Sequence, residues 1–300
     1  MSSPRLTLKT TLLLTLPPLL WAGNAVVGRL MVGSVAPLTL NFLRWVLAAL
    51  ILMPLGWRVL RPGSPLWPRW RSFALLGLLG VGSYNSLQYL ALQTSTPLNV
   101  TLIAASMPVW MLAVGALLYG ERPRLVQLWG AVFSLAGVML VIARGSWVAL
   151  MQVRLVPGDL YMIVAVILWA LYSWMLARPR DPAPRQWPWA EFLLAQIVFG
   201  VGWATLASGG ESLLREVRFD WTLPVIGALA YVAIAASLVA YRCWGVGVGL
   251  VGPAVAAFFS NLTPVFAAVL SAALLGETPQ WFHAAAFALI VGGIVVSSKR

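Results

Sequence analysis

Residues 97–144 read PLNVTLIAASMPVWMLAVGALLYGERPRLVQLWGAVFSLAGVMLVIAR. The last 48 residues, 253–300, read PAVAAFFSNLTPVFAAVLSAALLGETPQWFHAAAFALIVGGIVVSSKR and align with them without a gap, each residue matching the one 156 positions earlier. Ten of the 48 aligned positions are identical, and most of these are Pro, Gly, Glu or Arg, which match by chance less often than Leu or Ala. The chain is therefore predicted to contain two copies of one unit.

The composition of the chain indicates that its solvent is lipid. Hydrophobic residues make up 61% of it and charged residues only 9%, and its mean hydropathy is +0.88. A soluble domain of this composition could not cover its own exterior with polar groups. The apolar runs are continuous and lack the alternation of a membrane β-barrel, so helices that satisfy their own backbone hydrogen bonds are expected.

The sequence predicts an all-α integral membrane protein with ten transmembrane helices. A helix of roughly 20 apolar residues crosses a bilayer, and apolar segments of about this length follow one another with short connections. No soluble domain or cleavable signal peptide is expected. The predicted spans are 11–30, 36–56, 72–92, 97–119, 125–143, 158–177, 189–208, 222–242, 250–275 and 281–297.

The net charge of +12 is distributed unevenly between the two sides of this predicted topology. One side has fourteen basic residues: Arg5, Lys9, Arg58, Arg61, Arg69, Arg71, Arg122, Arg124, Arg178, Arg180, Arg185, Arg242, Lys299 and Arg300. The other side has five: Arg29, Arg144, Arg154, Arg215 and Arg218. Basic loops face the cytoplasm, so both termini are predicted to be cytoplasmic. The basic surplus is explained by topology and by affinity for anionic membrane lipid, and no nucleic-acid partner is expected.

Each copy contains an odd number of predicted spans, so the two copies cross the membrane in opposite directions. The predicted units are residues 1–145, a connecting loop at 146–157, and residues 158–300. Inverted repeats are typical of secondary transporters, whose substrate site lies near the midplane between the repeats, and rocking of the halves then alternates access. Gene duplication also produces static membrane proteins, and the repeat by itself does not exclude one.

The two copies carry a pattern that resembles a known family. The stretches SMPVWMLAVGALLYGERP (106–123) and SNLTPVFAAVLSAALLGETP (260–279), within a ten-span layout, resemble the drug/metabolite transporter superfamily and specifically its EamA-type members. Among these the chain looks most like bacterial aromatic amino-acid exporters. The resemblance implies a bacterial inner-membrane exporter of amino acids or similar small metabolites. It also implies a cavity lined by the first, third and fourth spans and their second-half equivalents.

Polar and aromatic residues deep in the spans are the candidates for substrate binding, because a polar group that faces lipid is costly. The candidates are Trp21, Asn24, Arg44, Tyr84, Asn85, Gln88, Trp110, Trp169, Tyr172, Tyr231, Phe258 and Asn261. Each has a second interpretation. Deep tryptophans also pack helices together, and amides such as Gln88 also tie helices by hydrogen bonds. Rings with a few amides would suit a flat, amphipathic solute.

Arg44 and two prolines are singled out by their positions within the spans. Arg44 is the one charge in the middle of a predicted span, so it should face the bundle interior; it could bind a substrate carboxylate or clamp backbone carbonyls. Pro108 and Pro264 lie at equivalent places in the two copies, and each removes a helical hydrogen bond. They are predicted hinges of alternating access, or else static kinks.

The residues that the spans lack are also informative. No acid falls at a span centre, so a facilitator without a proton relay is predicted, and the single histidine, His283, is interpreted as structural. No catalytic, metal or cofactor-binding residues are predicted, which argues against an intramembrane enzyme. A nucleotide-sugar or lipid carrier on the same fold remains open, as does the oligomeric state.

Overall fold

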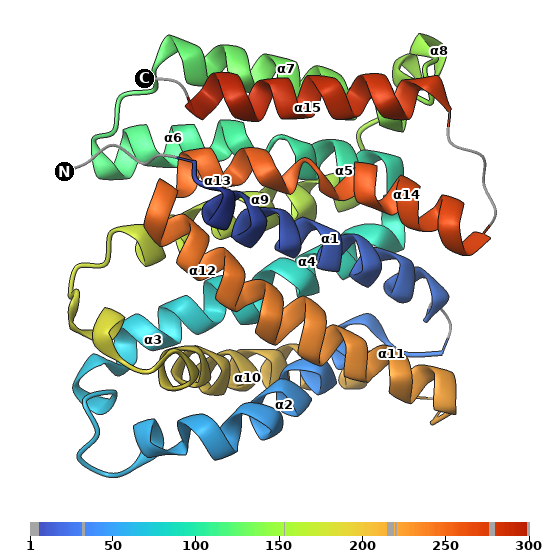
Figure 1. Ribbon diagram of the computed structural model, residues 1–300. Coiled ribbons are helices and arrows are strands. Elements are labelled where there is room, and N and C mark those ends of the chain that lie inside the picture. Colours follow the sequence, from blue (N-terminus) through green and yellow to red (C-terminus); the bar gives the residue numbers. More distant parts are fainter. Residues whose placement is uncertain are drawn as a thin grey trace.

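The computed structural model describes residues 6–31, 34–95, 97–152, 154–214, 219, 221–275 and 280–298. Within these ranges the chain is helical, apart from connections and one isolated antiparallel bridge between Val35 and Phe219. Figure 1 shows the long helices lying alongside one another across the molecule. The all-α prediction is therefore confirmed for the part of the chain that the structure describes.

The helices follow the predicted spans closely, with some spans divided. Their bounds are α1 Leu8–Leu30, α2 Pro37–Gly56, α3 Trp70–Leu76, α4 Tyr84–Thr94, α5 Pro97–Ala105, α6 Met107–Tyr119, α7 Leu125–Ile142, α8 Trp147–Met151, α9 Pro157–Ala177, α10 Trp189–Leu214, α11 Leu223–Ala233, α12 Ala240–Val251, α13 Pro253–Ser260, α14 Thr263–Leu275 and α15 Trp281–Ser298. Two π-helical segments, Gly77–Ser83 and Ile234–Val239, join α3 to α4 and α11 to α12. The short helix α8 was not predicted.

Seven segments within the described ranges are long and apolar enough to cross a membrane, judged by length and composition. They are Pro37–Leu60, Leu125–Ile142, Pro157–Ala177, Trp189–Leu213, Leu223–Val251, Pro253–Leu270 and Trp281–Ser298. The predicted first, third and fourth segments are helical too, but the fourth is divided into α5 and α6, which are each too short. The total of ten crossings stays a prediction.

The predicted end of the eighth span was wrong. Helix α11, the π-helical segment and α12 form one continuous helix, Leu223–Val251, so Arg242 lies inside a helix and not in a loop. The helix continues through Gly245, Gly247 and Gly249 as far as Gly252. There a φ of +83°, followed by Pro253, ends the helix.

Pro108 and Pro264 begin helices and do not lie inside continuous ones, which corrects the predicted spans 97–119 and 250–275. α5 ends at Ala105, and Pro108 lies in the first turn of α6, where its missing N–H has no partner to lose. The hydroxyl of Ser106 donates to the carbonyl of Ile103 at 2.6 Å. Pro264 similarly lies in the first turn of α14, after a break at Asn261 and Leu262.

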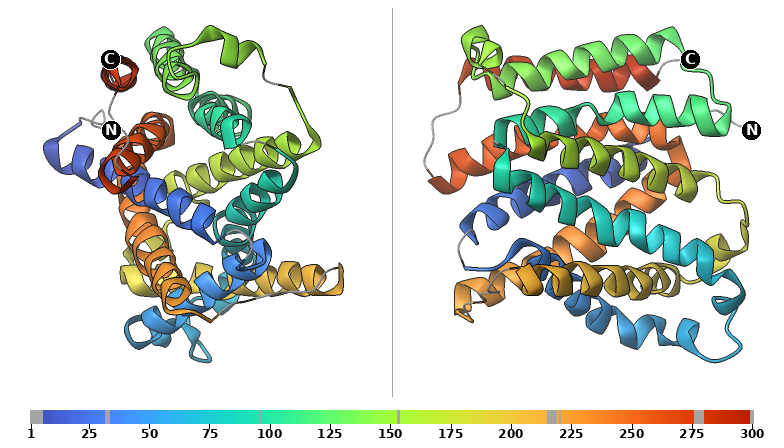
Figure 2. Two further views of the ribbon diagram at one scale, coloured as in Figure 1. Left: turned by 90° about the vertical axis from the view of Figure 1, so that its right-hand side faces the viewer. Right: turned by 180° about the vertical axis from the view of Figure 1, so that it is seen from behind.

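Helices α7 and α15 pack along each other through small residues, and the views in Figure 2 agree on this pairing. A Cβ added at Gly130 would lie 2.8 Å from the carbonyl oxygen of Gly293, and one added at Gly293 would lie 2.7 Å from that of Gly130. At Gly137 an added Cβ would lie 2.8 Å from the carbonyl oxygen of Ala286. In the repeat alignment Gly130 matches Ala286 and Gly137 matches Gly293. The contact between Gly137 and Ala286 is therefore the repeat counterpart of the contact between Gly293 and Gly130.

Many of the other helix contacts also cross between the two sequence copies. α1, the first helix of the first copy, packs against α12, α13 and α14, and α9, the first helix of the second copy, packs against α4, α5 and α6. α2 packs against α10. Each copy thus packs its first helix against the other copy's third and fourth spans.

The same kind of cap begins α7 and α15. The side-chain oxygen of Gln127 accepts the backbone N–H of Arg124 at 3.0 Å, and Nδ1 of His283 accepts the backbone N–H of Gln280 at 3.0 Å. Gln127 and His283 are equivalent positions of the repeat. The ring of His283 therefore has a capping role, as a structural histidine should.

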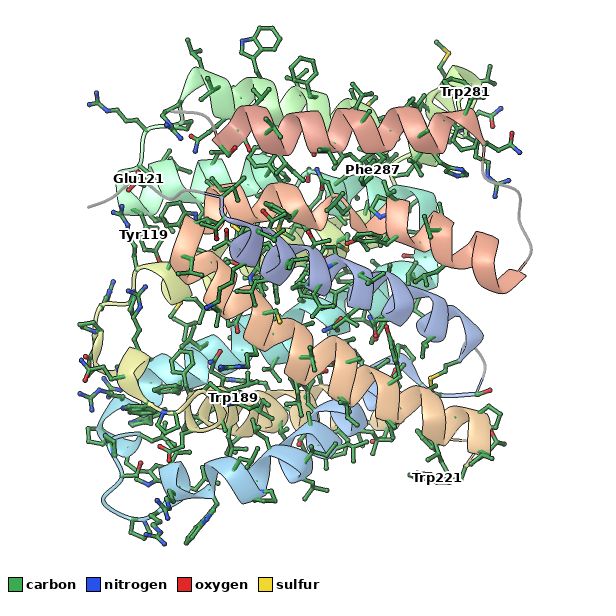
Figure 3. The ribbon with its side chains drawn as sticks, in the orientation of Figure 1. Tyr119, Glu121, Trp189, Trp221, Trp281 and Phe287 are labelled. Atoms are coloured by element: carbon green, nitrogen blue, oxygen red, sulfur yellow. The ribbon has the colours of Figure 1, made fainter. Side chains whose placement is uncertain are left out.

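The connections alternate between the two ends of the bundle. α1 begins and α15 ends at the same end, together with the α6–α7 and α9–α10 connections (Figure 1). In Figure 3 Tyr119 and Glu121 lie at this end, and Trp221 and Trp281 at the opposite one. Gly276, Glu277 and Pro279 of the repeat pattern lie outside the described residues.

Candidate functional site

Trp169 of α9 is surrounded by aromatic rings from three other helices. The ring centroids of Trp21, Tyr84, Tyr172, Tyr241 and Trp244 lie 5.5, 5.3, 5.1, 5.4 and 5.7 Å from that of Trp169. These six residues are called the Trp169 cluster. Trp169 itself is only 3% exposed. The cluster joins α1, α4, α9 and α12, so both sequence copies contribute to it.

Arg44 of α2 is fully buried and is held by the second π-helical segment. Its Nη2 donates to the carbonyl of Ala236 at 3.0 Å, and its Nε donates to the hydroxyl of Ser237 at 2.5 Å. The indole N–H of Trp21 donates to the same Ala236 carbonyl at 3.2 Å. A π-helical turn shifts the backbone hydrogen-bond register, which leaves carbonyls available to side chains. The guanidinium therefore lies directly beside the Trp169 cluster.

Several buried polar atoms near these helices have no hydrogen-bond partner among the described residues. They are Nη1 of Arg44, Oδ1 of Asn24, Oδ1 of Asn41, Nε1 of Trp45 and the hydroxyl of Tyr89. The ring of Trp45 packs edge-on against Tyr241 with centroids 4.9 Å apart. Unpaired buried polar atoms are rare and costly in folded proteins. They point to a missing partner such as a solute or water.

The structure brings only part of the predicted site together. Trp21, Arg44, Tyr84, Trp169 and Tyr172 meet at the Trp169 cluster, and Asn24 is buried with an unpaired oxygen. Asn85 and Phe258 are buried, and Gln88 is half-buried.

The other predicted residues make hydrogen bonds within the protein: that of Trp110 is local to the start of α6, and those of Tyr231 and Asn261 join distant helices. Trp110 donates to Ser106 at 3.1 Å, Tyr231 to the carbonyl of Leu20 at 3.0 Å, and Asn261 to Ser134 at 2.8 Å. Asn41, Trp45, Tyr241 and Trp244 were missed. Tyr241 and Trp244 lie three residues apart on one helix face. Tyr241 lay inside the predicted eighth span, and Trp244 could have been found by continuing that span past Arg242.

A cavity of about 540 Å³ adjoins the cluster and opens toward the α9–α10 connection. Tyr172, Tyr241 and Gln196 line its inner part, and Pro184, Arg185 and Trp187 line its outer part. The hydroxyl of Tyr172 donates to the side-chain oxygen of Gln196 at 3.0 Å. Tyr172 and Tyr241 belong both to the Trp169 cluster and to the lining of this cavity.

A metal site does not form within the described residues, which contain no group of three His, Cys, Asp or Glu side chains able to hold an ion. The two buried acids cap helices. Glu211 accepts the backbone N–H groups of Leu38 and Thr39 at 3.1 and 3.0 Å, and Asp159 accepts that of Val156 at 2.8 Å. The arrangement places packed aromatic rings beside a buried guanidinium.

The EamA-like transporter family matches the chain twice, over residues 8–143 and again over residues 156–299. The chain belongs to the EamA-like transporter family. The resemblance inferred from the sequence pattern is therefore confirmed, and the protein is a multi-pass membrane transporter. The two matched ranges correspond closely to the two sequence copies.

Named relatives align with this EamA-like transporter over nearly its whole length. An uncharacterized transporter of Archaeoglobus fulgidus is 28% identical over 97% of this chain and 98% of its own. A protein named aromatic amino acid exporter YddG of Ancylobacter novellus is 27% identical over 89% of each chain. One named probable amino-acid metabolite efflux pump, of Salmonella typhimurium, is 26% identical over 92% of this chain and 90% of its own. These relatives support the prediction that the protein is not an enzyme.

A solved protein structure superposes on the EamA-like transporter with a TM-score of 0.75, covering 96% of this chain and 97% of the other. The two sequences are 24% identical. At that identity the similarity shows the shared fold alone.

Proposed function

We propose that this EamA-like transporter exports small amphipathic metabolites, including aromatic amino acids, by alternating access around a chamber at the Trp169 cluster. Two relatives carry names that point to amino-acid export. The proposal is also supported by the chemistry of the site, because aromatic rings stack on a flat apolar body while polar groups hold the head of a solute.

The observation that carries the proposal is the free guanidinium nitrogen beside the rings. Nη1 of Arg44 is fully buried and unpaired among the described residues, while Nε and Nη2 are held by Ser237 and Ala236. A cation in a membrane interior needs a partner. A solute carboxylate would supply one when the rings of the cluster part to admit it.

The proposed architecture is ten membrane crossings in two inverted five-helix copies, residues 1–145 and 158–300, joined by 146–157. The double family match supports it. The α7–α15 contacts support it too, because a twofold axis in the membrane plane would exchange Gly137–Ala286 with Gly293–Gly130. The breaks before Pro108 and Pro264 would then be equivalent bending points of the two copies.

The proposed location is a bacterial inner membrane with both termini in the cytoplasm. Most of the basic connections lie at the end of the bundle where α1 begins and α15 ends, and basic connections favour the cytoplasmic side. The cavity between α9, α10 and α12 would then open to the cytoplasm, where an exporter takes up its solute.

Counterflow in proteoliposomes tests this function. Vesicles loaded with unlabelled phenylalanine, tyrosine and tryptophan should accumulate external labelled amino acid faster than empty vesicles. Trp169→Ala should reduce that rate at least tenfold, because it removes the centre of the ring cluster. The matched control is Trp129→Ala, since Trp129 lies on α7 and is 59% exposed. Absence of counterflow for every amino acid tried would refute amino-acid export.

A further inference from the structure

Arg242 is a cation inside the apolar helix Leu223–Val251 without an ion pair to any residue that the structure describes. Its guanidinium carbon lies 4.5 Å from the ring centroid of Trp189, at the start of α10. Both residues line the 540 Å³ cavity and also a second cavity of about 320 Å³, next to Lys9 and Cys243. Arg242 is exposed, and an ionisable residue inside a membrane segment is a candidate functional residue because placing its charge in lipid is costly. Its position between two cavities indicates what that function is.

The cavity is kept open by glycines on the same helix face as Arg242. Gly245 and Gly249 line it, and both lie within the helix α12. A Cβ added at Gly249 would meet nothing within 4 Å, and one at Gly245 would meet only Leu176 at 4.0 Å. Neither close packing nor backbone conformation therefore requires glycine here. Gly247, on the opposite face, differs because an added Cβ would collide with Leu14.

The charges around the cavity have one sign. Arg185 and Arg242 line it, and none of the acids that the structure describes does. Arg185 is already engaged, since its Nη2 donates to the carbonyls of Leu176 and Ala177 at the end of α9. Arg242 is left with the face of Trp189, a contact that leaves its N–H groups free to donate. The cavity thus offers a charged partner for a carboxylate, and no residue of opposite charge for an ammonium group.

The rest of the lining suits the body of such a solute. Tyr172, Trp187, Trp189, Phe192 and Tyr241 present rings along the cavity, from its mouth to the Trp169 cluster. We propose that this cavity is a loading site for aromatic monocarboxylates, in which Arg242 binds the carboxylate and the rings hold the body, with no requirement for an amino group. This rests on the proposed transport function and narrows its substrate class. From the loading site the solute reaches Arg44 once Tyr172 and Tyr241 move aside.

Three probes of one shape test the charge preference. 3-Phenylpropanoate, 3-phenylpropanamide and 3-phenylpropylamine carry a negative, a neutral and a positive head on the same body. Binding is measured by calorimetry on the full-length protein in nanodiscs of neutral phosphatidylcholine. The carboxylate should bind at least tenfold more tightly than the amide and the amine. Equal binding of carboxylate and amide, or no binding of the carboxylate, overturns the proposal.

Substitutions of residues that line the cavity test whether the preference for the carboxylate arises there. In the Arg44→Met background, which removes the other guanidinium, Arg242→Gln should bring the carboxylate-to-amide ratio to within twofold. Arg58→Gln, at an exposed residue of the 3-10 turn after α2, is the control and should leave the ratio unchanged. Gly249→Leu should fill the cavity and abolish binding without lowering the melting temperature. Gly292→Leu is its control, because an added Cβ at Gly292 also meets nothing within 4 Å and α15 does not line the cavity. A carboxylate preference that survives Arg242→Gln in that background, or binding that survives Gly249→Leu, overturns the assignment.

An anionic lipid headgroup on its acyl body shares this chemistry. The calorimetry is repeated in nanodiscs in which one-fifth of the lipid is phosphatidylglycerol. This shows whether the cavity binds the carboxylate solute or an anionic lipid. Unchanged carboxylate affinity supports a loading site for solutes, and loss of binding assigns the cavity to lipid and overturns the proposal. Counterflow is scored separately. Amino-acid counterflow without carboxylate preference would leave the transport function standing and refute only the loading site.

Discussion

Replacing Arg44 by Met tests whether its guanidinium serves the solute or the helices. Met retains much of the side-chain length and removes the charge. The two groups that accept hydrogen bonds from Arg44, the carbonyl of Ala236 and the hydroxyl of Ser237, each keep another hydrogen bond in the variant. The carbonyl of Ala236 keeps the indole N–H of Trp21 at 3.2 Å, and the hydroxyl of Ser237 still donates to the carbonyl of Val232 at 2.8 Å.

The expected effect of Arg44→Met on stability is small because two large terms oppose each other. Hydrogen bonds from charged donors contribute about 1.5–3 kcal/mol each, so losing those to Ser237 and Ala236 costs about 3–6 kcal/mol. Burying an ion costs several kcal/mol, and the variant no longer bears that cost. The free energy of unfolding should change by less than about 2 kcal/mol. The melting temperature should then shift by less than about 8 °C.

The assay pairs thermal unfolding in detergent, followed by tryptophan fluorescence, with counterflow in proteoliposomes. Arg44→Met should melt near the wild type and lose at least tenfold in amino-acid counterflow. Arg58→Met, in the exposed α2–α3 connection, is the control and should keep both properties. A melting temperature lowered by more than about 15 °C, which is more than about 4 kcal/mol, would mean that Arg44 is a structural clamp. Normal counterflow would mean that it does not bind the solute.

Three further perturbations follow from the packing. Gly293→Leu places a Cβ 2.7 Å from the carbonyl oxygen of Gly130 and should destabilise the protein by about 1–3 kcal/mol; detergent melting checks this, with Gly292→Leu as the control. Glu211→Ala leaves the buried N–H groups of Leu38 and Thr39 without their carboxylate and should cost about 2–4 kcal/mol. Faster hydrogen exchange at the start of α2 should accompany that loss, and unchanged exchange there would contradict the capping role. Pro108→Ala combined with Pro264→Ala should lower the counterflow rate while phenylalanine affinity by calorimetry stays the same, since the bending points serve movement and not binding; an unchanged rate would mean static kinks.

The helices could be predicted from the sequence because apolar runs and proline breaks act locally. All ten predicted segments are helical within the described residues. The end predicted at Arg242 was wrong, because the helix continues through Gly245, Gly247 and Gly249. Glycine weakens a helix, but it ends one readily only when a left-handed φ follows, as at Gly252.

The site was predicted in part because depth in a span can be read from sequence, whereas the neighbours of a side chain cannot. Trp21, Arg44 and Trp169 stood out as large or charged residues at span centres. Trp45 and Asn41 did not, because what marks them is an unpaired polar atom that depends on contacts between helices distant in the sequence. Arg242 was placed in a loop and so was never considered as a residue of the site.

The first helix of each copy packs against the other copy, and this has a consequence for biosynthesis. α1 leaves the ribosome early, yet α12, α13 and α14, against which it packs, are made near the end of the chain. The nascent protein must therefore hold α1 in the membrane without its final neighbours until translation is almost complete. A product truncated before α12 would carry an orphaned helix that quality-control proteases can recognise. In this transporter α1 can therefore form its final contacts only after α12, α13 and α14 have been inserted into the membrane.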